Sequence, residues 1–345
     1  MSDEAVIRSL STVQQTAWDR GEHSAPEEVA ADVWAFAVPI PGGMLPSTLG
    51  YALLSADGGV HLIDPGWPGD DAFDAVSAAL ATIGRRMADV RTVIATHFHP
   101  DHLGLCGRIR NETGAAVMFS ADERLVLAQE TAGERRDRAS YDLRLEAWGV
   151  PEDRRDDLRA EFDRPALVAD LDPDRLLRDG DAVDLPGHAL RVVTTPGHTG
   201  GHVCLVDEHR GLIYVGDHVL PRIYSGVGIG TLRPEQALAE LIDSLDRLAP
   251  YDDLQVLPGH EFRYRGLGVR RAEIVRHHLR RTREVAALLP ELGDAPIWEY
   301  ARRMTWTGGW AQLRGFSLHS ALRQTAMHLE LVRTGRAEGL FAREG

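Results

Sequence analysis

The 345-residue chain contains no lysine, only two cysteines and no apolar run long enough to cross a membrane. All 38 basic residues are therefore arginine, which is typical of a protein encoded by a GC-rich genome. Cys106 and Cys204 stand in apolar stretches, so we expect them to pack as small hydrophobic side chains and to form no disulfide. Residues 1–4 are acidic and lack the basic and apolar segments of a secretory signal, which favours a cytoplasmic protein.

The formal net charge is −14, and this acidic excess argues against a nucleic-acid partner. The charge is unevenly spread along the sequence. Residues 119–185 are strongly acidic, whereas residues 263–283 contain one glutamate and a group of arginines: Arg263, Arg265, Arg270, Arg271, Arg276, Arg280, Arg281 and Arg283.

Five short segments rich in branched apolar residues are each closed by glycine or proline, which predicts buried strands at 60–63, 92–95, 190–193, 212–215 and 254–257. Apolar residues recur at helical spacing over 73–83, with Asp70 or Asp71 expected to cap the helix start. A second helix is expected over 238–248, with Pro234 in its first turn. Strands alternating with helices predict a layered α/β fold.

Two further regions are expected to be helical. Residues 120–185 read as a helical insertion that either forms a solvated excursion or covers the site as a lid. Residues 266–345 form a helical C-terminal region. Its expected core includes an amphipathic stripe of Ala321, Leu322, Thr325, Leu329 and Val332. Three tryptophans add bulk to this core: Trp298, Trp306 and Trp310. We therefore divide the chain into a domain at 1–265, with the insertion inside it, and a region at 266–345.

Chemistry-bearing side chains follow four of the predicted strands. Seven imidazole and carboxylate groups are placed there: His97, His99, Asp101, His102, His198, Asp217 and His260. His97 and His99 are two apart on a loop, so both rings can turn to one side, and His198 completes a three-histidine metal site. Asp101, His102 and His260 can hold a second ion, and Asp217 can bridge the two. A water between two such ions becomes a nucleophile near neutral pH.

With these residues the chain resembles the metallo-β-lactamase superfamily, an αββα sandwich with metals at one edge of two facing sheets. The resemblance covers about residues 35–262 and is carried by Asp64, the 97–102 motif, His198, Asp217 and His260. It implies that Asp64 steadies a ligand histidine. The C-terminal helices resemble, more loosely, the degenerate winged-helix tail of the acyl-hydrolase-like branch.

Branches of the superfamily differ in features that this sequence shows. True β-lactamases of this fold are exported and lack an aspartate at the position of Asp217, and the diiron flavoproteins have glutamate where His99 stands. The tRNA-processing nucleases need a basic arm, whereas the insertion here is acidic. The resemblance is therefore strongest to the glyoxalase II-like and lactonase-like hydrolases, which cleave thioesters or lactones.

Other residues have candidate roles near the metals. In the lactonases a tyrosine after the bridging aspartate contacts the substrate carbonyl, and Tyr224 could act in that way or be an ordinary loop aromatic. His202 and His218 either support the ligands or stabilise the fold. Arg263 and Arg265 could hold the phosphates of a coenzyme A thioester; alternatively, the arginines pair with the acidic insertion.

We therefore predict a dinuclear metal-dependent hydrolase of a small ester, thioester or lactone. A metal-bridging hydroxide attacks the carbonyl, the metal at the three-histidine site stabilises the oxyanion, and Asp101 passes a proton to the leaving group. Zinc is the expected ion, with iron and manganese as alternatives. The expected partner is a small acyl compound, with neither nucleic acid nor membrane bound and with the oligomeric state, a homo-oligomer included, left open.

Three alternatives stay open at the sequence level. One is a mononuclear iron persulfide dioxygenase, which resembles this chain in the motif that starts at His97. Another is a phosphodiesterase acting on a small nucleotide. The third is a metal-holding scaffold without catalysis, which the full ligand set disfavours.

Overall fold

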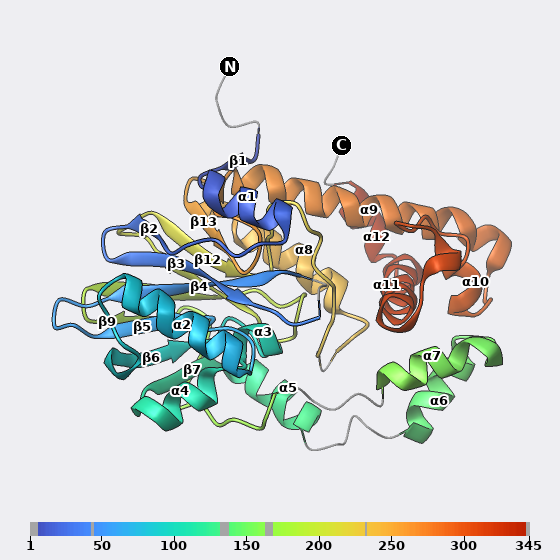
Figure 1. Cartoon of the computed structure of the whole chain (residues 1–345). Coiled ribbons are helices and arrows are strands. Elements are labelled where there is room, and N and C mark those ends of the chain that lie inside the picture. Colours follow the sequence, from blue (N-terminus) through green and yellow to red (C-terminus); the bar gives the residue numbers. More distant parts are fainter. Residues whose placement is uncertain (1–5, 43–44, 132–137, 163–167, 232, 343–345) are drawn as a thin grey trace.

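The computed structural model describes residues 6–42, 45–131, 138–162, 168–231 and 233–342. Within these ranges two seven-stranded sheets pack face to face, and helices cover the outer face of each (Figure 1). The predicted layered α/β sandwich is confirmed.

The first sheet runs in simple chain order from β2 to β8. Its strands are β2 (Glu27–Ala30), β3 (Val33–Pro39), β4 (Ser47–Leu54), β5 (Val60–Ile63), β6 (Val90–Ile94), β7 (Ala116–Ser120) and β8 (Arg175–Leu177). Strands β2 to β5 are antiparallel neighbours, whereas β5 to β8 pair in parallel and so need crossover connections. Helices α2 (Asp70–Thr82) and α4 (Cys106–Thr113) lie in the first two crossovers and pack on the outer face through Phe73, Val76, Leu80 and Ile109.

The second sheet has the order β1-β14-β13-β12-β11-β10-β9. Its strands are β1 (Arg8–Ser9), β9 (Ala182–Leu185), β10 (His188–Thr194), β11 (Val203–Asp207), β12 (Leu212–Gly216), β13 (Gln255–Pro258) and β14 (Tyr264–Arg265). The neighbours are antiparallel except for β12 and β13, which are joined through α8 (Ala237–Arg247). Helix α9 (Leu267–Leu292) crosses the outer face beside α8.

The core between the sheets is built from branched apolar side chains that both sheets contribute. Tyr51 of β4 and Tyr214 of β12 meet there edge to face, with ring centroids 5.2 Å apart. The Tyr51 hydroxyl donates to the carbonyl oxygen of Pro258 over 2.6 Å, which ties the first sheet to the end of β13. The strand ends that carry the predicted ligands are therefore held against each other by the core itself.

The insertion predicted at 120–185 contributes α5 (Ala121–Thr131), α6 (Arg138–Ala147) and α7 (Glu152–Phe162), but its last part is not helical because β8 and β9 lie there. The C-terminal region contributes α10 (Ile297–Ala301), α11 (Gly315–Arg333) and α12 (Arg336–Phe341). Helices α6 and α7 lie beside α11 (Figure 1). Their shared core contains Tyr141, Leu145, Leu158, Trp298, Leu318 and Leu322. The far part of the insertion thus packs on the C-terminal helices. Its predicted function as a lid stays a prediction.

Shorter elements complete the chain. Helix α1 (Thr12–Arg20) precedes the first sheet, α3 (Pro100–Leu103) follows β6, and 3₁₀ turns span Met87–Asp89, Ala249–Tyr251 and Trp310–Gln312. None of the described helices is long and apolar enough to span a membrane.

The five predicted strands are all present, within one to two residues of their expected ends. Both cysteines are buried and free, as expected. Two predicted helix starts are wrong in detail. Asp70 is the first residue of α2 and Gly69 holds the cap position, so neither Asp70 nor Asp71 caps the helix; the Asp70 carboxylate pairs with Arg108 at 2.7 Å. Pro234 lies in a turn, and α8 begins only at Ala237.

Candidate metal centre

The loop that follows β6 presents four of the seven predicted ligands at one edge of the sandwich. The backbone N–H and hydroxyl of Thr96 both donate to the Asp64 carboxylate over 2.8 Å, which fixes where this loop begins. Asp64 directly follows β5 and has a φ of 51°, an uncommon conformation for a residue with a side chain. Pro100 then starts α3, whose first turn carries Asp101 and His102.

The other three ligands follow strands of the second sheet: His198 comes after β10, Asp217 after β12 and His260 after β13. Gly259 is required beside them, because a Cβ atom there would lie 2.5 Å from Asp217 Oδ1 and 2.6 Å from His102 Cε1. The structure therefore brings all seven predicted ligands to the edge where the two sheets meet.

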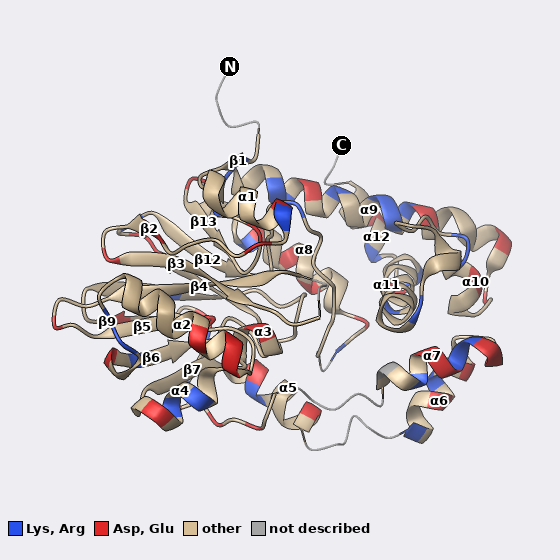
Figure 2. Cartoon of the chain, viewed as in Figure 1, with Lys and Arg blue, Asp and Glu red and all other residues tan. Residues whose placement is uncertain are grey.

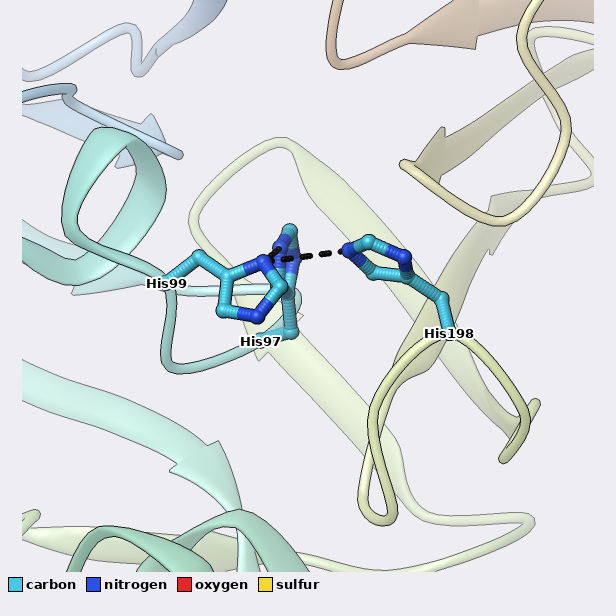
Figure 3. A group of neighbouring side chains, drawn as sticks. All are labelled: His97, His99 and His198. Carbon is cyan, nitrogen blue, oxygen red and sulfur yellow. Dashed lines mark hydrogen bonds between the residues drawn. The ribbon is translucent and has the colours of Figure 1, made fainter. Parts of the chain in front are cut away.

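Three histidines form the first cluster, which we call the three-histidine group: His97, His99 and His198. His99 Nδ1 lies 3.0 Å from His97 Nε2 and 3.1 Å from His198 Nε2 (Figure 3). The three nitrogen atoms come from two loops, and they lie close enough together to hold one ion.

Asp101, His102 and His260 form the second cluster, the mixed group. Asp101 Oδ2 lies 3.3 Å from His260 Nε2 and 3.6 Å from His102 Nε2. Asp217 stands between the clusters. Its Oδ1 lies 3.3 Å from His260 Nε2, whereas Oδ2 lies 3.7 Å from His198 Nε2 in the three-histidine group. One carboxylate thus faces both clusters, as the predicted bridging role requires.

The outer nitrogen atoms of most ligand rings are held by an acceptor, whereas His99 Nε2 is buried and has no hydrogen-bond partner among the described residues. His198 Nδ1 donates to the Gly226 carbonyl over 2.7 Å, and His260 Nδ1 donates to the Ser47 carbonyl over 2.9 Å. His102 Nδ1 lies 3.0 Å from Asp64 Oδ2, where the resemblance places that carboxylate. Such contacts fix the tautomer and turn the lone pair of each inner nitrogen toward the centre.

The centre fits metal ions by the chemistry of its donors. His102 Nε2, His260 Nε2 and Asp217 Oδ1 are buried and have no hydrogen-bond partner among the described residues. Buried polar atoms are normally hydrogen-bonded, so unsatisfied ligand atoms that converge on one point are suited to hold a cation. Imidazole and carboxylate suit zinc, iron and manganese. The residues present therefore fit two divalent ions.

The two clusters differ in charge. Burial lowers the pKa of His99 to about 3, and the neighbouring His198 adds to the shift. Burial alone would also lower the pKa of His260, but the carboxylates of Asp217 and Asp101 outweigh it and raise the pKa to about 10. Burial would raise the pKa of Asp101, yet His102 and His260 bring it down to about 2. The three-histidine group is thus neutral, whereas the mixed group holds ion pairs in the metal-free protein.

His202 and His218 lie behind the three-histidine group. The His202 ring is 5.2 Å from that of His97, and its Nδ1 lies 2.8 Å from the hydroxyl of Thr195. His218 is buried next to it, with ring centroids 5.6 Å apart. Both rings pack near the ligands, and within the described part of the chain neither forms a hydrogen bond to a ligand nitrogen.

Tyr224 is exposed and lies against α9. Its ring stacks on His277 with centroids 4.0 Å apart, and the Arg270 guanidinium lies 4.5 Å from the ring centroid. These contacts do not place the hydroxyl at the ligands. The predicted contact with a substrate carbonyl stays a prediction.

The contacts of the arginine-rich stretch do not include the expected pairing with the insertion, and the predicted binding of phosphate by Arg265 stays a prediction. Arg263 is buried and pairs with Glu27, and Arg265 donates to the Asp253 carbonyl over 2.5 Å. The ion pairs of α9 include Arg270 with Glu273 and Arg271 with Asp252. None of these partners lies in the insertion, so the expected pairing with it is wrong for these residues. Because Arg263 is already paired, it is also poorly placed to bind phosphate.

The insertion forms ion pairs within itself and also with other parts of the chain, as between Asp157 and Arg314 of the C-terminal region at 3.7 Å. Figure 2 shows basic as well as acidic residues on α6 and α7. Arg159 of α7 pairs with Asp142 of α6 at 2.8 Å and with Glu152 at 3.2 Å.

Two residues near the centre were not anticipated from the sequence. Trp18 of α1 lies with its ring 6.1 Å from that of His260, and no motif pointed to it. Glu123 of α5 is fully buried and hydrogen-bonds to both ligand loops. Its signal was Ser120-x-x-Glu123, a pattern that marks a helix start and no more.

Two facing sheets with a histidine and aspartate centre at their common edge define a metal-binding αββα sandwich. The family model for the metallo-beta-lactamase superfamily matches residues 51–260, more than half of the chain, and the chain belongs to that superfamily. A solved metallo-beta-lactamase family protein from Thermus thermophilus is 28% identical, with a TM-score of 0.70 that covers 90% of this chain and 95% of that one.

The curated relatives align with a smaller share of this chain than the Thermus thermophilus structure does. A probable metallo-hydrolase of Bacillus subtilis is 28% identical over 66% of this chain and 71% of its own length. A lactamase-like protein of Aspergillus niger is 32% identical, and the match spans only 37% of that protein and 39% of this chain. A human acyl-coenzyme A thioesterase is 34% identical over 28% of this chain and 34% of its own length.

Proposed function

We propose that the protein is a dinuclear metal-dependent hydrolase of a small ester, thioester or lactone. The observation that carries the proposal is the seven-residue centre, in which Asp217 faces both clusters with its two carboxylate oxygens. The thioester is preferred among these substrates because a thioesterase is among the similar proteins. Zinc, a cytoplasmic location and a small acyl compound as partner belong to the same proposal.

The ligand side chains would hold one ion in the three-histidine group and one in the mixed group. Two ions held there would supply Lewis acidity, which lowers the pKa of a water and polarises a substrate carbonyl. Asp217 and Asp64 fix the geometry: the first joins the clusters, and the second keeps the His102 ring in place.

Asp101 is the group that we assign to proton movement. Its side chain is 15% exposed and its low pKa keeps it ionised at neutral pH. A base this weak holds a proton only transiently, so Asp101 would take one from the attacking water and pass it at once to the leaving thiolate or alkoxide. The water oxygen joins the carbonyl carbon, and the carbon–sulfur or carbon–oxygen bond breaks.

The experiment that tests the proposal compares two substrates on one zinc-loaded preparation: an acyl-coenzyme A thioester and bis(p-nitrophenyl) phosphate. We expect thioester cleavage to be faster and to fall about 100-fold or more in Asp217→Asn, which excludes a contaminating esterase. A dominant phosphodiester rate would overturn the acyl assignment in favour of a phosphodiesterase. Oxygen consumption by the iron-loaded protein with a persulfide would overturn hydrolysis altogether.

A further inference from the structure

Glu123 is a fully buried carboxylate in the first turn of α5, outside every motif that defines the metal centre. Its hydrogen-bond donors are two backbone N–H groups and one hydroxyl, all of them neutral. Burying a carboxylate without a cationic partner costs free energy, so the hydrogen-bond donors around it must be well placed to offset that cost. Burial raises the pKa of Glu123 to about 7, although the three hydrogen bonds act to lower it.

The donors come from both loops of the three-histidine group. Glu123 Oε2 accepts from the backbone N–H of Phe98 over 3.0 Å, and Phe98 stands between His97 and His99. Oε1 accepts from the N–H of Gly201 over 2.7 Å and from the hydroxyl of Thr199, which directly follows His198. One carboxylate thus connects the two loops that supply the three nitrogen ligands.

Helix α5 is itself fixed against the second loop. The Ser120 hydroxyl donates to the Gly201 carbonyl over 2.5 Å and accepts from the Glu123 N–H over 3.0 Å. Gly201 packs so closely on the helix that a Cβ atom there would lie 2.2 Å from the Glu123 nitrogen. The carboxylate therefore has a rigid base, and the N-terminal end of the helix favours its negative charge.

The three-histidine group needs such a tie. His99 Nδ1 lies 3.0 Å from His97 Nε2 and 3.1 Å from His198 Nε2, so without an ion the neutral His99 ring can donate a hydrogen bond to either of them (Figure 3). An ion needs the lone pairs of all three nitrogen atoms and therefore removes these hydrogen bonds, which leaves the two loops with no direct tie between the histidines themselves. The mixed group is different, because its carboxylates attract its imidazoles.

We propose that Glu123 is a positioning residue for the three-histidine group, holding its two loops at metal-binding distance before an ion arrives. The inference rests on the metal centre of the proposed function, and it is independent of which substrate is cleaved. It concerns the affinity for the ion of one cluster, so it can be tested without any turnover.

The test separates the clusters by deleting one ligand from each. His260→Ala leaves the three-histidine group as the stronger site, and His198→Ala leaves the mixed group. Glu123→Ala is added to each, and zinc affinity is measured on metal-free protein by competition with a chelator. We expect Glu123→Ala to weaken zinc binding by about 10- to 100-fold in the His260→Ala background and to change it little in the His198→Ala background.

Two controls distinguish a local effect on metal binding from a general loss of stability. Glu123→Gln keeps the shape and one acceptor oxygen, so we expect a smaller loss and a folded protein if the alanine variant is unstable. Asp207→Asn removes another buried carboxylate, which accepts from Arg210 at the far end of β11, and should leave both affinities unchanged.

Equal losses in both backgrounds, or a loss in Asp207→Asn as large as in Glu123→Gln, would show a general effect on folding and overturn the inference. So would unchanged zinc affinity in the His260→Ala background. Failure of the proposed function looks different: the unsubstituted protein would bind two ions, respond to Glu123→Ala as expected, and cleave no ester.

Discussion

At the residue scale, the centre depends most on Asp217, because its two oxygens face different clusters. Asp217→Asn replaces one of them with an amide nitrogen, which is a donor and cannot bind a cation. We expect the zinc content to fall from about two ions per chain to about one, and the rate to fall about 100-fold or more. Elemental analysis and the thioester assay measure the two effects on one preparation. Full activity with two ions would contradict the dinuclear centre.

A second prediction at this scale concerns protons. Between the pKa of a free histidine and about 10, His260 is protonated in the metal-free protein, and the pKa of His102 is also raised because nearby carboxylates outweigh its burial. An ion entering the mixed group must displace these protons, so its affinity rises with pH by up to about tenfold per unit for each proton released. The three-histidine group, with pKa values lowered by burial, releases almost none.

Isothermal titration of zinc in buffers of different ionisation enthalpy measures this release. The His198→Ala protein measures proton release from the mixed group. The His260→Ala protein measures release from the three-histidine group, although His102, whose pKa is also raised, is still present. We expect clearly more protons released per ion in the first variant. Equal release would mean that the carboxylates do not hold protons on the mixed group.

At the scale of single elements, the turn between β13 and His260 has room for glycine but not for a larger residue at position 259. In Gly259→Ala, the added methyl group would meet Asp217 Oδ1 and His102 Cε1 at about 2.5 Å and push the ligands apart. We expect a folded protein that loses most of its metal and at least about 90% of its activity. Gly339→Ala on α12, where a Cβ atom meets nothing within 4 Å, is the matched control and should be neutral. A fully loaded Gly259→Ala protein would show that the turn can move aside.

The contact between the insertion and the C-terminal helices makes another prediction. Leu158 of α7 is fully buried in the core that it shares with Leu318 and Leu322 of α11. Leu158→Ala should cost about 2–5 kcal/mol locally, and amide protection should fall in α7 and α11 together while the sheets keep theirs. Leu143→Ala, on the exposed face of α6, should stay within about 0.5 kcal/mol of the unsubstituted protein. Loss of protection in α7 alone would contradict a shared core.

How much of this was predictable from the sequence depends on the range of each interaction. The strands and the ligand loops were predictable because β-branched runs, closing glycines and the spacing from His97 to His102 are local signals. The contacts of Glu123 were not, because its donors are 25 and 78 residues away. The packing of α7 on α11 and the ion pair between Arg263 and Glu27 could not be predicted for the same reason, because the partners are far apart in the sequence.

At the scale of the whole molecule, the centre joins two halves of the fold, since four ligands follow the first sheet and three follow the second. Bound zinc should therefore stabilise the entire chain by mass action, by about 2.7 kcal/mol at 100 times its dissociation constant. Adding a chelator should lower the melting temperature by several degrees and leave the far-ultraviolet circular dichroism unchanged, because hydrogen bonds already hold the loops. Loss of secondary structure on chelation would contradict a preformed centre.

The strand order has a consequence for the newly made chain. Strand β1 is synthesised first, yet Ser9 pairs with Tyr264 at the far edge of the second sheet. The first sheet can assemble as it leaves the ribosome, whereas β1 must wait until nearly the whole sandwich has emerged. His260 leaves the ribosome shortly before that partner strand does. The four ligands of the first loop are thus made well before His198, and the complete centre for zinc arises only after His260 has been added.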